Sequence, residues 1–145
     1  MKAVFIGSDP GVAEMARASI RICWPEALPQ VATRVSEGLR LVKETSPDVV
    51  LLQASPPDIP VFEAILEMRS YSRVPLLVLG GQHDETELMT CLELGADDYI
   101  SLPYDSILVR AHIWALMRRV YGAQGTVASC WNPVINPASR QVFLN

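Results

Sequence analysis

The hydrophobic and polar positions of this 145-residue chain alternate between two kinds of segment. Short, solidly apolar runs predict buried strands, and longer segments with apolar residues three or four positions apart predict amphipathic helices. The predicted strands cover residues 3–6, 30–35, 47–53, 74–79 and 98–101, and the predicted helices cover residues 11–22, 36–44, 61–70, 84–94 and 106–121. Strands that alternate with helices imply right-handed crossovers and a parallel sheet, so the pattern predicts an α/β fold.

The strand at residues 47–53 is the centre of this pattern. Val49, Val50, Leu51 and Leu52 form a continuous apolar run, as expected of a strand buried on both faces. In open α/β sheets, ligands bind beyond the carboxyl ends of such strands, and here that end carries Gln53. An amide forms hydrogen bonds but is uncharged and a poor nucleophile, so we expect no chemistry at Gln53.

Local signals define several helix ends. Ser8 or Asp9 is placed to cap the first helix, and Gly95 follows the fourth helix where a left-handed cap favours glycine. The residues predicted on or beside the buried side of the last helix are Ile107, Val109 or Arg110, Ile113, Leu116 and Val120.

Composition restricts the class of protein. Half of the residues are hydrophobic, which is enough for a full core, and the net charge of −4 gives no reason to expect nucleic-acid binding by this portion. Residues 74–109 contain no Lys or Arg but seven acidic residues, which form either a solvated face or an interaction surface. Three distant cysteines, no metal-binding spacing, and no signal or membrane-spanning run predict a cytoplasmic protein without cofactor or metal.

Three local patterns together resemble the receiver domain of bacterial two-component response regulators, across roughly residues 1–121. They are Ser46-Pro47-Asp48-Val49-Val50-Leu51-Leu52 followed by Pro57-Asp58; Leu94-Gly95-Ala96-Asp97-Asp98-Tyr99-Ile100; and Pro103-Tyr104 with Ala111-His112-Ile113 and Met117-Arg118-Arg119. The resemblance implies a flavodoxin-like (CheY-like), doubly wound, five-stranded parallel sheet in the order 2-1-3-4-5. The Met-Arg-Arg ending is similar to the OmpR/PhoB-type winged-helix subclass. Residues 122–145 then resemble a linker and the start of a truncated DNA-binding domain.

The positions that carry receiver chemistry are changed in this chain. By the resemblance, Gln53 stands at the position of the phosphoacceptor Asp. Gly7 and Ser8 stand at the positions of the metal-binding acidic pair, with Asp9 one place too late. Gly80 stands at the position of the hydroxyl residue, and Leu102 stands at the position of the lysine. Gly and Ser supply no anionic oxygen for Mg²⁺, and Leu102 cannot neutralise a phosphoryl group. We therefore interpret the chain as a pseudo-receiver. Tyr99 occupies the position of the aromatic whose rotamer reports activation, and a static packing role is expected for it.

The resemblance also implies a two-fold dimer through the fourth helix, the fifth strand and the fifth helix. We expect it to rest more on apolar side chains than on charge and to form without phosphorylation. The residues assigned to this interface are Leu88, Leu92, Asp97, Asp98, His112, Trp114, Arg118 and Arg119.

Three functions remain to be distinguished. The first is a non-enzymatic regulatory domain that dimerises or binds a partner protein and positions a DNA-binding domain on paired half-sites. The second is a sensor that admits a small molecule into the changed pocket, where two glycines leave room. The third, a phosphoacceptor using Ser8, Ser55 or another side chain, is disfavoured by the loss of charge. Gln53 itself either holds the first loop by hydrogen bonding or is an ordinary polar residue at a strand end.

Overall fold

The computed structural model describes residues 1–54, 58–81 and 84–122. The predictions made for residues 55–57 and for the segment 123–145, which includes the expected start of a second domain, lie outside the described residues. Within them, no helix is long and apolar enough to cross a lipid bilayer.

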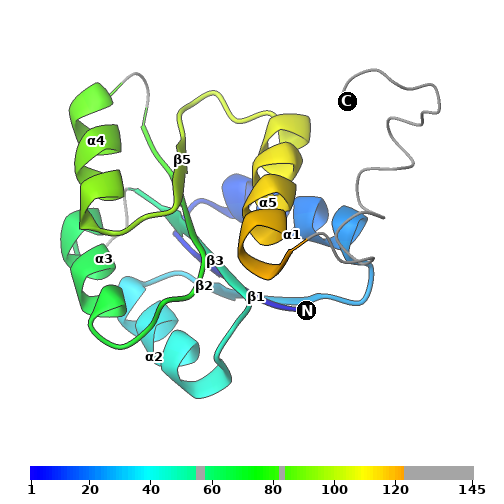
Figure 1. The fold of residues 1–145 in the computed structure, drawn as a ribbon, viewed down its shortest axis with the longest axis horizontal. Helices are drawn as coiled ribbons and strands as arrows, with labels where there is room; N and C mark the ends of the chain where they lie inside the picture. Colours follow the sequence, from blue (N-terminus) through cyan, green and yellow to red (C-terminus); the bar gives the residue numbers. More distant parts are fainter. Residues whose placement is uncertain (55–57, 82–83, 123–145) are drawn as a thin grey trace.

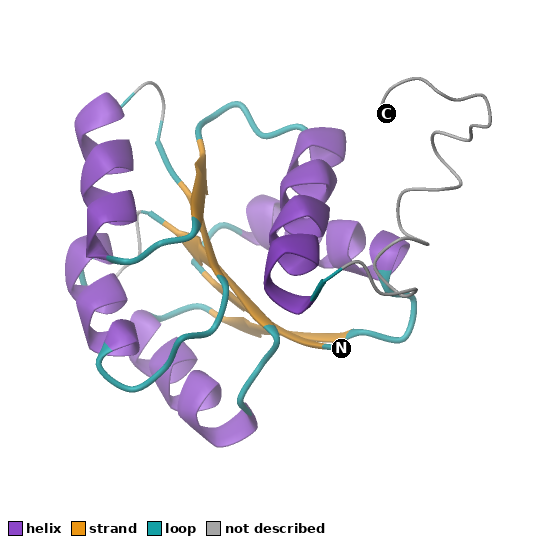
Figure 2. Ribbon diagram, in the orientation of Figure 1, coloured by secondary structure: helices purple, strands orange, loops and turns teal. Residues whose placement is uncertain are grey.

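Five parallel strands form one sheet in the order β2-β1-β3-β4-β5, which confirms the predicted fold class and strand order. Figures 1 and 2 show the sheet between two groups of helices, with α1 and α5 on one side and α2, α3 and α4 on the other. The elements are β1 (Lys2–Ile6), α1 (Pro10–Cys23), β2 (Leu28–Ala32), α2 (Val35–Thr45), β3 (Val49–Gln53), α3 (Val61–Arg69), β4 (Leu76–Leu79), α4 (Glu85–Leu94), β5 (Asp98–Ile100) and α5 (Ser106–Tyr121).

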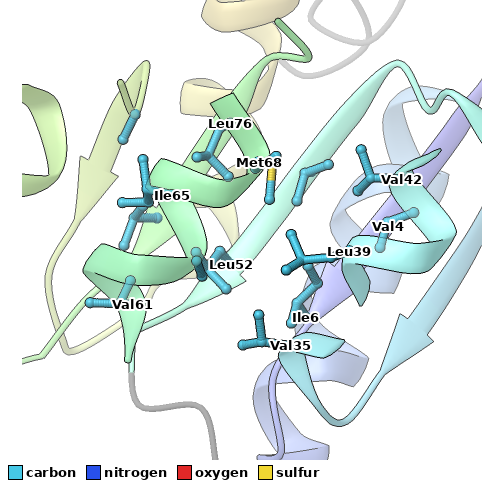
Figure 3. Close-up of a cluster of buried hydrophobic side chains, with 14 of the residues drawn as sticks. Val4, Ile6, Val35, Leu39, Val42, Leu52, Val61, Ile65, Met68 and Leu76 are labelled. Carbon is cyan, nitrogen blue, oxygen red and sulfur yellow. The ribbon is translucent and has the colours of Figure 1, made fainter. Parts of the chain in front are cut away.

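The two faces of the central strands belong to two separate cores. In β3, Val49 and Leu51 pack with α1 and α5, whereas Val50 and Leu52 pack with α2, α3 and α4. Figure 3 shows the second core, where Leu52 lies among side chains of β1, α2 and α3. Because successive side chains of a strand point to opposite faces, a continuous apolar run fills both layers.

The helix ends follow from local chemistry. Asp9 caps α1, since its Oδ1 accepts hydrogen bonds from the backbone N–H of Gly11 (2.9 Å) and Val12 (3.3 Å); Ser8 does not serve as the cap. Gly95 ends α4 with a φ of 129°, a conformation that favours glycine, as predicted.

The second strand differs from the prediction. It covers Leu28–Ala32, and Val35, expected to end the strand, is the fully buried first residue of α2. The reason is a distant cap: the Asp58 carboxylate accepts hydrogen bonds from the N–H groups of Val35 (2.8 Å) and Ser36 (3.0 Å). Asp58 thereby satisfies the first donors of α2, which no pattern local to residues 30–36 reveals.

Two expected core positions of α5 are also wrong. Ile107 is 57% exposed and Val120 is 45% exposed. The buried side of α5 consists of Val109, Ile113 and Leu116, as predicted, together with Met117, and these residues pack in the first core.

Candidate functional site

The carboxyl ends of the strands bring together the positions singled out from the sequence. Ile6 pairs with Leu52, Gln53 pairs with Leu79, and Leu79 pairs with Ile100. The residues that follow these strands therefore lie along one edge of the sheet. We call this region, made of Gly7–Asp9, Gln53, Gly80, Gly81 and Leu102, the crater.

Gln53 fills the side of the crater next to β1. Its Oε1 accepts a hydrogen bond from the backbone N–H of Asp9 at 3.3 Å. A Cβ atom placed on Gly7 would lie only 2.7 Å from the Cβ of Gln53 and 2.9 Å from the Cζ of Phe5. Gly7 is thus the residue that lets Gln53 pack against the first loop, and Gln53 holds this loop by a hydrogen bond.

The remaining acid of the first loop is already engaged. The Asp9 carboxylate faces the N-terminus of α1 and caps it, while Gly7 offers no side-chain oxygen and Ser8 offers an uncharged hydroxyl. Mg²⁺ is held in proteins by hard oxygens, usually including carboxylates. These residues do not fit Mg²⁺, and in the described part of the chain no three His, Cys, Asp or Glu side chains come together as a metal site.

Tyr99 fills the side of the crater next to β4. The Tyr99 side chain is 6% exposed, and its phenol donates a hydrogen bond to Oε1 of Glu87. A Cβ atom on Gly80 would overlap the hydroxyl and the ring of Tyr99 and would lie 2.6 Å from its Cε1. The Tyr99 ring thus occupies the space that any side chain at position 80 would need.

The carboxylate of Glu87 fixes this arrangement. Besides the Tyr99 phenol, its Oε1 accepts a hydrogen bond from the backbone N–H of Gly81 at 3.3 Å. Burial raises the pKa of Tyr99 well above its ordinary value, and the hydrogen bond and charge of Glu87 raise it further. Tyr99 is therefore a neutral donor at any physiological pH, and its hydrogen bond to Glu87 fits the packing role expected of it.

The loop after β5 also borders the crater. The Tyr104 phenol donates a hydrogen bond to the Gly80 carbonyl, and burial, followed by the charges of Glu87 and Asp9, raises the pKa of Tyr104 to about 12. Leu102 precedes a cis peptide bond to Pro103, donates its N–H to the Gly81 carbonyl at 3.3 Å and is 40% exposed. An alkyl side chain at this position supplies no cation to the crater.

The charged residues assigned to the dimer interface have partners within the chain. Asp97 accepts a hydrogen bond from Arg69 (3.0 Å), and His112 Nδ1 lies 2.6 Å from Asp98 Oδ2. Arg118 lies over the ring of Trp114, 4.7 Å from its centroid. Arg119 also reaches the Asp97 carbonyl at 3.4 Å. These charged side chains already have partners within the chain, so apolar side chains are the main groups of this face that remain available for contact.

The apolar residues of the same face differ in exposure. Leu88 is partly buried against the second core, and Trp114 is partly buried against the first core. Leu92 is 39% exposed, and Met89, which the sequence analysis did not include, is 53% exposed. Figure 1 shows β5 between α4 and α5, at the edge of the sheet.

Three residues outside the sequence-based assignment organise the region. Arg69, whose side chain is 12% exposed, donates to the carbonyls of Gly95 (2.9 Å), Val74 (2.7 Å) and Ser72 (3.2 Å) as well as to Asp97. Glu87 and Asp58 were likewise missed. For Glu87 a signal existed, because Asp84 followed three residues later by Glu is a capping-box pattern; Arg69 and Asp58 act over long sequence distances that no local pattern reveals.

The fold and the crater define the class of this domain: it has the fold of response-regulator receiver domains. A two-component response regulator from Clostridium difficile matches with a TM-score of 0.76 at 17% identity, over 83% of this chain and 98% of the other. The BeF3-activated N-terminal receiver domain of RstA from Klebsiella pneumoniae matches with a TM-score of 0.73 at 23% identity, over 81% and 99%. These likenesses establish the fold.

Sequence relatives are transcriptional response regulators. The transcriptional regulatory protein AfsQ1 of Streptomyces coelicolor is 32% identical over 118 residues, which are 80% of this chain and 52% of AfsQ1. The KDP operon transcriptional regulatory protein KdpE of Escherichia coli is 32% identical over 88 residues, or 61% of this chain and 39% of KdpE. The chain thus spans about half the length of AfsQ1 and less of KdpE. No family model matches the chain.

Proposed function

We propose that this domain is a phosphorylation-independent receiver of a transcriptional response regulator, which acts by dimerisation or by binding a partner protein to control a C-terminal DNA-binding domain. The observation that carries the proposal is the filled crater. Gln53 packs against Gly7 on one side, and Tyr99 occupies the space beside Gly80 on the other. Position 53 carries an amide in place of a carboxylate, and the Tyr99 ring lies where a side chain at position 80 would lie.

Chemistry supports the same conclusion. Phosphoryl transfer depends on metal ions and cations that neutralise the equatorial oxygens of the transferred group. Asp9 caps α1 through its Oδ1, Gly7 and Ser8 supply no carboxylate, and position 102 is a leucine, so these positions supply neither an acidic pair nor a lysine. The domain is therefore proposed to be regulatory rather than enzymatic.

Dimerisation through α4, β5 and α5 is part of the proposal. Asp97, Asp98 and Arg118 have partners within the chain, so contact between two copies would rest on Leu92 and on the partly buried Leu88 and Trp114. A two-fold contact of this kind needs no phosphorylation to form and would place two downstream DNA-binding domains for paired half-sites.

Phosphorylation is tested by incubating the protein with acetyl phosphate and Mg²⁺ and measuring its intact mass. No added phosphate is expected on the wild type. Gln53→Asp is also expected to remain unmodified, because the metal-binding acids and the lysine are still missing. A stoichiometric mass increase on the wild type would overturn the proposal.

Dimerisation is tested by sedimentation velocity at micromolar concentration. Leu92→Asp places a charge on the proposed interface and is expected to give a monomer. The matched control is Leu28→Asp, because Leu28 is 71% exposed and lies on β2, at the opposite edge of the sheet. A wild-type monomer, or a dimer that Leu92→Asp leaves intact, would contradict the proposed interface.

The alternative of a small-molecule sensor in the crater receives less support. The room expected at the two glycines is taken by Gln53 at Gly7 and by Tyr99 at Gly80.

A further inference from the structure

A cavity of about 420 Å³ lies at the amino-terminal edge of the sheet, the edge opposite to the crater. Its walls are the end of α2, the segments that lead into β3 and β4, and the last turn of α5. We call it the basal cavity. Its volume lies within the range of roughly 300–1,000 Å³ that is typical of small-molecule sites.

The charged side chains that line the basal cavity are positive, whereas the net charge of the whole chain is negative. Lys43 and Arg73 line it, and no carboxylate is among the lining residues. Within the described part of the chain, neither Lys43 nor Arg73 forms an ion pair with an acidic side chain, and the Arg73 guanidinium donates one hydrogen bond, to the Arg69 carbonyl at 3.1 Å. Two positive side chains that share one concave site, in a chain of net charge −4, favour an anionic ligand.

Two tyrosines give the cavity flat and fixed walls. The ring of Tyr71 lies under the ammonium group of Lys43, 4.6 Å from Nζ to the centroid, and its hydroxyl donates to the Leu39 carbonyl at 3.2 Å. The hydroxyl of Tyr121 donates to the Asp48 carbonyl at 3.0 Å. Burial raises the pKa of both phenols, and the nearby charges of Glu67 and Asp48 raise them further, so both rings stay neutral.

The remaining walls are largely apolar. Val42, Val74, Val120, Pro47 and Pro75 complete the lining together with a few serines. A ligand that suits these walls has a flat apolar body, which packs against rings and alkyl groups, and one negative group, which meets the two cations.

We propose that the basal cavity binds a small aromatic carboxylate. The carboxylate is held between the guanidinium of Arg73 and the ammonium of Lys43, which lies over the ring of Tyr71, and the aromatic ring of the ligand lies against Tyr121 and the apolar walls. This site is separate from the crater and does not depend on the function proposed for it. Because Tyr121 is the last residue of α5, a bound ligand would contact the end of this helix.

The experiment titrates indole-3-carboxylate into the ¹⁵N-labelled 145-residue protein and follows backbone amide shifts. We expect saturable shifts centred on Lys43, Tyr71–Val74 and Tyr121, with a Kd of about 1 mM or lower. Indole-3-carboxamide, which has the same ring without the charge, is expected to bind at least about tenfold more weakly.

Variants assign the contacts. Lys43→Gln and Arg73→Gln are each expected to weaken binding by about tenfold, since each removes one charged hydrogen-bond donor. The matched control, Arg21→Gln, removes a cation from the last turn of α1 and should leave the Kd unchanged. Circular dichroism establishes that each variant is folded, and the two single substitutions serve as independent tests if one of them unfolds.

Three outcomes would overturn the proposal. They are the absence of saturable shifts at about 5 mM indole-3-carboxylate, equal binding of the carboxamide, and shifts centred on the crater rather than on the basal cavity. Retention of wild-type affinity by both folded variants would also refute the assignment of the carboxylate to Lys43 and Arg73.

Discussion

The packing of Tyr99 against Gly80 can be tested by a double-mutant cycle. Gly80→Ala adds a single methyl group where the Tyr99 hydroxyl and ring now lie. The backbone does not oppose this change, since among the described residues only Gly95 and Gly122 are glycines with positive φ. Any cost of Gly80→Ala therefore reports the position of the Tyr99 ring.

The expected cost follows from what the Tyr99 ring must give up. Overpacking of a well-filled core costs about 1–3 kcal/mol. If the ring moves away, the domain also loses the hydrogen bond to Glu87, and bonds to charged groups contribute about 1.5–3 kcal/mol. We expect Gly80→Ala to lower the free energy of unfolding by about 3 kcal/mol, which moves the urea midpoint by about 1.5 M for a slope near 2 kcal/mol per M.

The second substitution of the cycle is Tyr99→Leu. Leucine keeps an apolar side chain in the second core but has no atoms at the positions of Cζ and the hydroxyl. In the Tyr99→Leu background, Gly80→Ala should cost less than about 0.5 kcal/mol, so the coupling energy between positions 80 and 99 should be about 2–3 kcal/mol. Urea unfolding followed by circular dichroism at 222 nm measures all four proteins.

The matched control is Gly81→Ala. A Cβ atom at Gly81 would have no neighbour within 4 Å, so this substitution should be nearly neutral. If Gly80→Ala is as mild as Gly81→Ala, or if its cost is the same with Tyr99 and with Leu at position 99, the ring does not occupy the space beside Gly80 and the reasoning fails.

Three further predictions concern other residues. Arg69→Met should lower the free energy of unfolding by about 3 kcal/mol, because half-buried carbonyls and Asp97 lose a charged donor, and Arg69→Lys should restore less than half of it in urea unfolding. For Asp58, burial raises the pKa, but the N–H groups of Ser36 and Val35 outweigh it and lower the pKa from 3.8 to about 2. A lowered folded-state pKa stabilises above the unfolded value, so Asp58→Ala should lower the melting temperature at pH 7, and its difference from wild type should shrink between about pH 4 and pH 2 in thermal melts. Equal differences at pH 7 and pH 2 would contradict the cap. Gln53→Asp should place a carboxylate against the Asp9 region without a metal partner, and calorimetry with MgCl₂ up to about 10 mM should detect no heat of binding.

The sequence predicted the layered architecture well because the signal is repeated along the chain. The apolar runs of β3 and β4 fill both cores, and each helix shows its own period, so no single residue decides the fold. The helix caps at Asp9 and Gly95 were also predictable, since the residues that form them are adjacent in sequence.

The missed features depend on contacts between distant residues. The start of α2 at Val35 is set by Asp58, 23 positions away, and the junction of α3, β4 and α4 is held by Arg69, 26 positions before Gly95. The two glycines of the crater illustrate the same limit. Their small size indicated free space, whereas the structure shows that Gln53 and Tyr99 fill it from neighbouring strands. Only the three-dimensional arrangement distinguishes an empty site from a packed one.

The pairing of a glycine at position 80 with an inward tyrosine at position 99 also constrains the mutational routes open to this chain. A hydroxyl residue introduced at position 80 alone would meet the ring, and a smaller residue at position 99 alone would leave a void in the second core. Each of these two single substitutions is therefore expected to give a less stable protein. Positions 80 and 99 are therefore expected to change together, because a side chain larger than glycine at position 80 needs a smaller one at position 99.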